Sequence, residues 1–296
     1  MSTAGGGARS SARGELRAPA LVGVLGGGRM GSGIAHAFIC AGARVRLAEA
    51  NEAAARAALG RVEEALRRSD EKGTLGEPLE AARSRLEVGS GPGYLAGSEL
   101  VVEAVPEDPA LKAALLGALE RVVGPGAAIA TNTSSLSIDE LGACLERPER
   151  FCGLHFFNPV PASQLIEVVV GRATSPELVD RARRWVAALA KTAVVIRDSP
   201  GFASSRLGIA LGMEAVRMLE EGVAAAEDID AAMVLGYKHP VGPLRLSDLV
   251  GLDVRLAIAD YLASRLGERF RPPELLRQKV ARGELGKKTG QGFYSW

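Results

Sequence analysis

The amino-acid sequence predicts an α/β protein in which a doubly wound sheet with a helical arm is followed by an all-α C-terminal domain. Three observations predict this fold class. After Pro19, short apolar runs alternate with longer amphipathic segments, which is typical of a parallel sheet flanked by helices. A glycine-rich segment directly follows the first apolar run. From Asp198 onward the strand pattern stops and only helical periodicity remains.

The predicted strands are short runs rich in aliphatic residues. Several of them are apolar on both faces, as expected for strands covered by helices on each side. We predict eight strands, over residues 21–25, 45–48, 86–88, 100–105, 127–131, 151–156, 165–170 and 193–196.

The sequence also indicates where the helices between these strands begin. Residues 108–109 (Asp-Pro) and 175–176 (Ser-Pro) each predict an N-cap followed by proline at the first helical position. The connection over residues 51–89 is too long for a simple crossover. It predicts two helices, about 52–72 and 77–85, which could form a helical arm.

The remainder of the chain predicts helices over residues 200–222, 227–235, 252–266 and 273–282. We therefore divide the chain into a flexible tail, a sheet domain and a helical domain, over residues 1–17, 18–197 and 198–296. The tail is rich in Gly, Ser and Arg and lacks the apolar core of a secretory signal. A transit peptide is the alternative for this segment.

Composition and charge exclude several classes of function. The 296 residues include 36 Lys and Arg against 35 Asp and Glu, which gives a net charge of +1. A nucleic-acid-binding protein is typically much more basic, so this class is excluded. No apolar run approaches the roughly 18 residues that a membrane helix needs. Cys40, Cys144 and Cys152 are odd in number and widely spaced, which fits neither a disulfide framework nor a zinc site. We expect a cytoplasmic protein without nucleic-acid, membrane or metal partners.

The glycine-rich segment Gly26-Gly27-Gly28-Arg29-Met30-Gly31 fits the pattern GxGxxG, between a strand and a helix. Its glycines allow a tight turn, so that a pyrophosphate can bind the N–H groups at the helix N-terminus. Glu49 ends the second strand, 18 residues beyond Gly31, and can accept hydrogen bonds from an adenosine ribose. This carboxylate would repel a 2′-phosphate, so a Rossmann-type domain that binds NAD rather than NADP is predicted. The alternative is a glycine-rich turn without a ligand.

Polar residues also follow other strands, at the edge where an open α/β sheet binds ligands. They are Glu107, Asn132, Ser134, Ser135 and Asn158, and we expect them to converge on one crevice.

His155 is the candidate general base among three histidines. His36 lies on the first helix and His239 in a Pro-rich turn, and both are more typical of structural residues. If the chain turns at Pro161, His155 and Glu167 lie six residues on either side and face each other across two strands. A carboxylate partner holds one tautomer and makes the imidazole more basic, which suits alcohol oxidation. The alternative is a buried pair that only satisfies its own hydrogen bonds.

Taken together, the chain resembles the L-3-hydroxyacyl-CoA dehydrogenase family, in particular its short bacterial 3-hydroxybutyryl-CoA dehydrogenases, from about Ala20 to Trp296. The resemblance rests on seven ordered stretches, over residues 22–35, 102–105, 131–136, 153–159, 198–202, 239–243 and 286–294.

The resemblance implies reversible, NAD-dependent oxidation of an (S)-3-hydroxyacyl-CoA to the 3-oxoacyl-CoA, with His155 as general base and Glu167 as its orienting partner. Ser134 would touch the substrate hydroxyl or the cofactor. Lys72, on the helical arm, would reach the coenzyme A phosphates with help from Arg67 or Arg68, although a solvated helix face is the alternative. The helical domain would close the cleft and form a homodimer. The implied NAD contacts are Glu49, Glu107, Lys112, Asn158 and Lys288.

Two positions depart from the family pattern. Ser205 stands where the family has a catalytic-site Asn that positions the acyl carbonyl or the catalytic His. Ser163 and Gln164 stand where the family has Met-Lys, which removes a positive charge. Two alternatives therefore stay open: a catalytically weakened nucleotide-binding relative, and a dehydrogenase of a free hydroxy acid or sugar acid.

Overall fold

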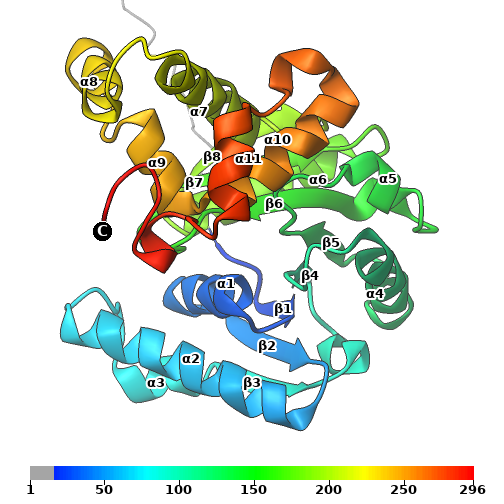
Figure 1. The fold of residues 1–296 in the computed structure, drawn as a ribbon. Helices are drawn as coiled ribbons and strands as arrows, with labels where there is room; N and C mark the ends of the chain where they lie inside the picture. Colours follow the sequence, from blue (N-terminus) through cyan, green and yellow to red (C-terminus); the bar gives the residue numbers. More distant parts are fainter. Residues whose placement is uncertain (1–16) are drawn as a thin grey trace, which may run out of the picture. The chain divides into compact units, whose positions relative to one another are not determined.

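The computed structural model describes residues 17–296, so the predicted tail lies outside the described residues except for Arg17 (Figure 1). Contacts within the chain define two compact units. The first runs up to Asn132 and continues over Leu141–Val195; the second comprises Thr133–Glu140 and Ile196–Trp296. No helix within residues 17–296 is both long enough and apolar enough to cross a bilayer.

The sheet has eight strands in the order β3-β2-β1-β4-β5-β6-β7-β8. Strands β1 to β6 are parallel to one another, and β7 runs antiparallel to β6. The prediction of a doubly wound α/β sheet is confirmed, and each predicted strand is present. The strands are β1 Leu21–Leu25, β2 Arg44–Glu49, β3 Leu86–Ser90, β4 Leu100–Glu103, β5 Ala128–Thr131, β6 Phe151–Phe156, β7 Leu165–Val170 and β8 Thr192–Arg197.

The strand order places a topological switch point between β1 and β4. The chain builds β1, β2 and β3 outward in one direction, then returns to add β4 on the other side of β1. Ligands of open α/β sheets bind beyond the carboxyl ends of the strands at such a point. The loops that follow β1, β4 and β5 all lie at this edge because these strands are parallel.

The helices of the sheet unit cover the strands with apolar stripes. Helices α1, α2 and α6 share one buried cluster with alternate strand residues such as Val22, Val24, Leu100 and Val102. The predicted helical arm is present as α2 and α3: one face of α2 packs into this cluster and the other is exposed. These helices are α1 Arg29–Cys40, α2 Glu52–Glu71, α3 Leu79–Arg83, α4 Pro109–Val122 and α6 Pro176–Ala188, while α5 Ile138–Gly142 begins within the segment assigned to the second unit.

Local capping explains where two of these helices begin. The Asp108 carboxylate accepts hydrogen bonds from the N–H groups of Ala110 and Leu111, at 2.8 and 3.0 Å. The Ser175 hydroxyl accepts one from Leu178 at 3.2 Å. Both predicted N-caps are confirmed.

The second unit is all-helical, as predicted, and its core includes Ile209, Met213, Val216, Leu252 and Leu262. Its helices are α7 Ser204–Glu220, α8 Ala226–Ala231, α9 Pro243–Val250, α10 Leu252–Leu266 and α11 Glu274–Ala281.

Helix α9 is absent from the predicted elements because its N-terminal cap comes from far along the chain. The Asp230 carboxylate accepts hydrogen bonds from Leu244 N and Arg245 N, at 2.8 and 2.9 Å. From local sequence, Pro240 and Pro243 indicate only a turn. The predicted helix over 227–235 is present as α8, Ala226–Ala231, followed directly by a short π-helix, Ala232–Gly236.

A buried carboxylate anchors the C-terminal segment to α9. Asp248, 1% exposed, accepts hydrogen bonds from Phe293 N, Tyr294 N and Trp296 Nε1, at 2.9 to 3.0 Å. A Cβ at Gly292 would lie 2.2 Å from the same carboxylate, so this close approach requires glycine. The glycine-rich terminal stretch that contributes to the resemblance is therefore explained by packing.

Candidate active site

The glycine loop between β1 and α1 has the geometry of a nucleotide-binding turn. Gly26 has a φ of +92°, and a Cβ there would lie 2.9 Å from the carbonyl of Ala104. A Cβ on Gly31 would lie only 1.8 Å from the carbonyl oxygen of Gly26. Glycine is therefore required at both positions for α1 to approach β1.

The N-terminus of α1 is left open for an anion. Its N-cap residue is Gly28, none of the described side chains caps it, and its first turn holds no acidic residue. Gly28 and Arg29 are exposed, Met30 is half-buried, and a Cβ on Gly28 would meet no described atom within 4 Å. Uncapped N–H groups beside open space fit the pyrophosphate of a dinucleotide.

Glu49 lies beside this loop, as predicted. Its Oε1 accepts a hydrogen bond from Gly27 N at 2.7 Å, and its Oε2 accepts one from Ala50 N at 3.2 Å. The carboxylate is half-buried at the end of β2, where it can also accept hydrogen bonds from ribose hydroxyls. Its negative charge opposes a 2′-phosphate.

Lys112, one of the expected NAD contacts, lies in the interior of the sheet unit. Its side chain is 1% exposed, and its Nζ donates to Glu103 Oε1 at 2.7 Å and to the Val105 carbonyl at 3.2 Å. Because Glu103 is fully buried, it requires this counter-charge. Lys112 Nζ also lies 3.4 Å from Glu107 Oε2, so this buried ammonium group contacts the loop that follows β4.

The His155 and Glu167 side chains form the pair that the sequence predicts. Strands β6 and β7 pair in a register that places His155 opposite Glu167. His155 Nδ1 lies 2.8 Å from Glu167 Oε2, with the imidazole side chain 8% exposed and the carboxylate fully buried. The ring of Phe157 packs against the imidazole at a centroid distance of 4.3 Å. The prediction of cross-strand partners is confirmed.

Hydrogen bonds from two side chains, which the sequence analysis did not predict, fix the hairpin that carries this pair. Asn132, at the end of β5, accepts a hydrogen bond from Phe156 N through its Oδ1 at 2.9 Å. Lys191 Nζ donates to the carbonyls of Val160, at 2.7 Å, and Ser163. A Cβ on Gly33 of α1 would lie 2.9 Å from Val160, so the hairpin turn packs directly on the helix that begins at the glycine loop. Only the polar strand end at Asn132 gave a sequence signal.

The basic residues of α2 differ in their surroundings. Arg67 pairs with Glu64, at 2.7 Å, and with Glu71, while Arg68 pairs with Glu64 at 2.7 Å. These contacts favour the solvated-face interpretation for both arginines. Lys72 is the exposed C-cap residue of α2.

The remaining predicted site residues are exposed or belong to the second unit. Asn158 is exposed in the turn after β6. Ser205 is half-buried as the second residue of α7, and Lys288 Nζ pairs with Asp253 at 2.6 and 2.7 Å. Ser134 is half-buried in the segment over residues 133–140.

The segment that carries Ser134 is bound to the beginning of the helical unit. The Asp198 carboxylate accepts hydrogen bonds from Ser137 Oγ at 2.6 Å and from Asp139 N at 2.9 Å. Arg265 of α10 forms an ion pair with Glu140. These three contacts explain why residues 133–140 group with the second unit, although they lie within the predicted sheet domain.

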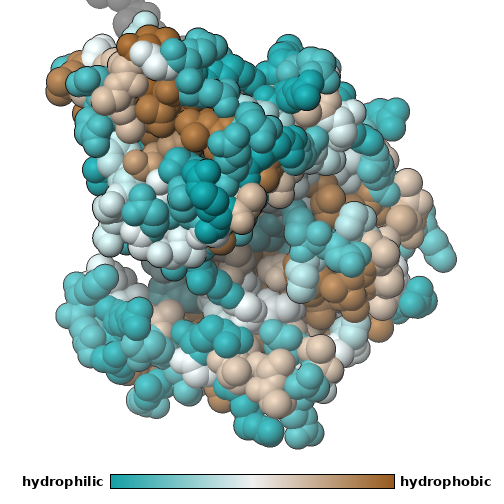
Figure 2. Space-filling model, viewed as in Figure 1, coloured by the Kyte–Doolittle hydropathy of each residue, from teal (hydrophilic) through white to brown (hydrophobic). Residues whose placement is uncertain are grey.

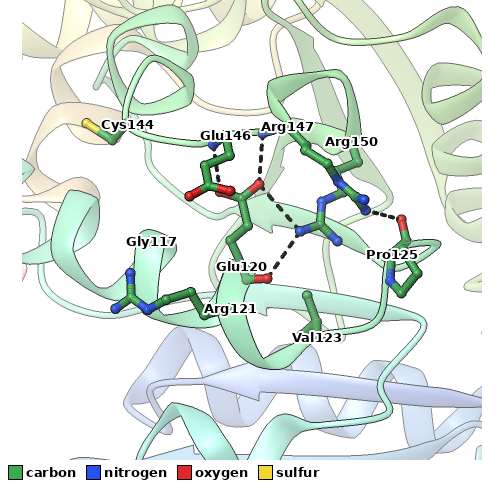
Figure 3. A pocket seen from close by; sticks show the side chains of 9 residues that line it. All are labelled: Gly117, Glu120, Arg121, Val123, Pro125, Cys144, Glu146, Arg147 and Arg150. Atoms are coloured by element: carbon green, nitrogen blue, oxygen red, sulfur yellow. Dashed lines mark hydrogen bonds and ion pairs between the residues drawn. The ribbon is translucent and has the colours of Figure 1, made fainter.

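A separate pocket of about 300 Å³ lies between the end of α4 and the segment that precedes β6 (Figure 3). It is at the amino ends of the parallel strands, the edge opposite the glycine loop. Glu120 pairs with other groups of its lining: it accepts hydrogen bonds from Glu146 N and Arg147 N, at 2.7 and 3.0 Å, and forms an ion pair with Arg150. This pocket is not the candidate active site.

Comparison with known proteins covers both units. Residues 21–199 match the family model described as 3-hydroxyacyl-CoA dehydrogenase, NAD binding domain, and residues 201–296 match that of the 3-hydroxyacyl-CoA dehydrogenase C-terminal domain. A probable 3-hydroxybutyryl-CoA dehydrogenase of Bacillus subtilis is 42% identical over 275 residues, covering 92% of this chain and 96% of the relative.

Two solved structures resemble the chain over most of its length. FadB2 of M. tuberculosis has a TM-score of 0.88 at 41% identity, and (S)-3-hydroxybutyryl-CoA dehydrogenase PaaH1 from Ralstonia eutropha has 0.89 at 37%. Each comparison covers 94% of this chain and 99% of the other. The likeness therefore extends to both units.

Proposed function

Because the chain belongs to the 3-hydroxyacyl-CoA dehydrogenase family, we propose that it oxidises an (S)-3-hydroxyacyl-CoA reversibly to the 3-oxoacyl-CoA with NAD. The proposed substrate is 3-hydroxybutyryl-CoA or a close homologue. The observation that carries this proposal is the His155–Glu167 pair on β6 and β7, in the same sheet that presents the uncapped glycine loop.

His155 is the proposed general base. The carboxylate of Glu167 accepts a hydrogen bond from Nδ1–H, which fixes the tautomer and makes Nε2 the basic nitrogen. Nε2 takes the proton of the substrate 3-hydroxyl, and the buried carboxylate stabilises the imidazolium that forms. Bound NAD supplies the acceptor for the hydride that leaves C3.

The cofactor is held by residues of the sheet unit. The open N-terminus of α1 binds the pyrophosphate, and Glu49 binds the adenosine ribose. Glu107 and Asn158, in the loops after β4 and β6, are proposed NAD contacts, and so is Lys288 of the helical unit. Lys112 acts through Glu103 and Glu107 from the interior.

The substrate contacts proposed are Ser134 at the 3-hydroxyl, Ser205 near the acyl group and Lys72 at the coenzyme A phosphates. Ser205 has a shorter reach than the family's Asn, so a catalytically weakened site is the second candidate. A panel of 3-hydroxyacyl-CoA esters and free hydroxy acids, assayed with NAD and with NADP, tests the proposal. Turnover of esters with NAD supports it; turnover of free acids alone would contradict it.

We also propose a homodimer formed through the helical unit. Large apolar side chains are exposed there, among them Leu207 at 70%, Leu235 at 70% and Tyr237 at 75%. Apolar surface gathers over α7 to α9 (Figure 2), and exposed patches of this kind commonly mark protein–protein contacts. Sedimentation equilibrium of the chain and of Tyr237→Asp tests this proposal, since a monomeric chain would contradict it.

We propose a cytoplasmic location. None of the three cysteines forms a disulfide, and Cys40 and Cys144 are exposed. Exposed thiols suit a reducing compartment. Fractionation of cells that express the full chain tests this assignment.

A further inference from the structure

A side chain outside the glycine motif reaches into it. Arg61, on α2, donates two hydrogen bonds to the carbonyl oxygen of Gly27, from Nε at 2.9 Å and from Nη2 at 2.7 Å. Ser32 Oγ donates a third to the same oxygen at 2.7 Å. The N–H of Gly27 is held by Glu49, at 2.7 Å. Side chains from three different elements therefore hold both polar groups of this one residue.

The Gly27 carbonyl controls the direction of the next amide. A trans peptide is planar, and its C=O and N–H groups point in opposite directions. Fixing the Gly27 oxygen toward α2 therefore aims the Gly28 N–H away from α2. Gly28 is the N-cap residue of α1, and the space beside its Cα is open. A cationic donor on the carbonyl also polarises the peptide and strengthens its N–H as a donor.

The glycine loop packs directly on α2, and this packing places the Arg61 guanidinium within hydrogen-bonding distance of the Gly27 carbonyl. A Cβ on Gly27 would lie 2.4 Å from Ala58 Cβ, one turn before Arg61, and 2.7 Å from Leu47. Arg61 itself is exposed, so its removal leaves no cavity in the core.

We propose that Arg61 is a positioning residue for the dinucleotide. It locks the Gly27–Gly28 peptide so that the Gly28 amide points at the pyrophosphate, and it makes α2 part of the cofactor site. This inference rests on the proposed use of NAD, but not on the identity of the oxidised substrate.

The test compares Arg61→Met, which keeps the stem and removes the donors, with Arg61→Lys, which keeps one charged donor. Arg56→Met is the matched control, since Arg56 lies on the same helix with its side chain 73% exposed. Calorimetry measures the Kd for NAD and for ADP, and steady-state kinetics separate the two KM values from kcat.

We expect Arg61→Met to raise the Kd and KM for NAD about 10-fold, and the Kd for ADP equally, because both ligands carry the pyrophosphate. The value of kcat and the KM for the acyl-CoA should stay within about twofold, with Arg61→Lys intermediate and Arg56→Met unchanged. An unchanged Kd for NAD in a folded Arg61→Met protein overturns the inference. So does a fall in kcat with an unchanged KM for NAD.

Direct binding separates the two possible failures. If the chain binds NAD and shows the Arg61 effect but does not oxidise 3-hydroxyacyl-CoA esters, the inference holds and the proposed function fails. If the unaltered chain does not bind NAD, the inference fails as well. Should Arg61→Met not fold, the same comparison is made with Arg61→Lys.

Discussion

Arg255 occupies a position where an apolar residue is expected. It lies in the buried stripe of α10 with Leu252, Ala259 and Leu262, and it is 6% exposed. Its Nε is buried without a hydrogen-bond partner among the described residues. Gly208 of α7 provides room, since a Cβ there would lie 3.1 Å from Nη1. We predict that replacing Arg255 with Met stabilises the protein.

The size of the effect follows from the buried charge. Burial lowers the pKa of Arg255 to about 10, so the side chain is still protonated at pH 7. The gap between this value and the ordinary arginine pKa corresponds to about 3 kcal/mol of destabilisation. This penalty is fully present below pH 10 and declines as the pH rises above that value, because the folded state loses its proton first.

Urea and thermal unfolding of Arg255→Met measure the prediction. At pH 7 we expect the free energy of unfolding to rise by about 2–3 kcal/mol, and the gain to shrink above about pH 10. Arg271→Met is the control, since that side chain is 73% exposed and its replacement should change stability little. A lower stability of Arg255→Met would refute the reasoning.

Three further predictions concern the site. Glu167→Gln keeps the shape of the side chain and removes its charge, so kcat should fall roughly 100-fold or more with little change in NAD binding; an unchanged kcat would exclude an orienting role toward His155. Gly28→Ala should leave the melting temperature unchanged but raise the KM for NAD. Gly31→Ala should instead destabilise the fold, because its Cβ would lie 1.8 Å from the Gly26 oxygen. Thermal melts and NAD titrations of the two variants test this difference. Ser205→Asn should increase kcat for 3-hydroxybutyryl-CoA if the site is weakened by one missing contact, and an unaltered rate in the assay would remove Ser205 as the cause.

The sequence predicts those features that depend on neighbouring residues. The register of β6 and β7 follows from a turn at Pro161, so the pairing of His155 with Glu167 could be predicted and is confirmed. The glycine loop could be predicted because the spacing GxGxxG between a strand and a helix is a signal that neighbouring residues carry by themselves. The family membership inferred from ordered motifs is likewise confirmed.

Features that depend on distant contacts could not be predicted. The burial of Lys112 against Glu103 depends on how α4 packs near β4 and β5. The cap of α9 comes from Asp230, and the Gly27 carbonyl is held by Arg61, 34 residues away. Each contact joins elements whose relative placement is decided by the whole core.

The attachment of the C-terminal segment to Asp248 gives this protein a built-in optical probe. The indole N–H of Trp296 donates to that carboxylate, and the Arg245 guanidinium lies 5.3 Å from the centroid of the indole ring. Release of the segment would break this hydrogen bond and the contact with Arg245, and so change the fluorescence of the indole, while Trp185, 7% exposed on α6 of the other unit, would keep its surroundings. Replacing Trp185 with Phe would isolate the Trp296 signal, so that loosening of the helical unit could be followed without a label.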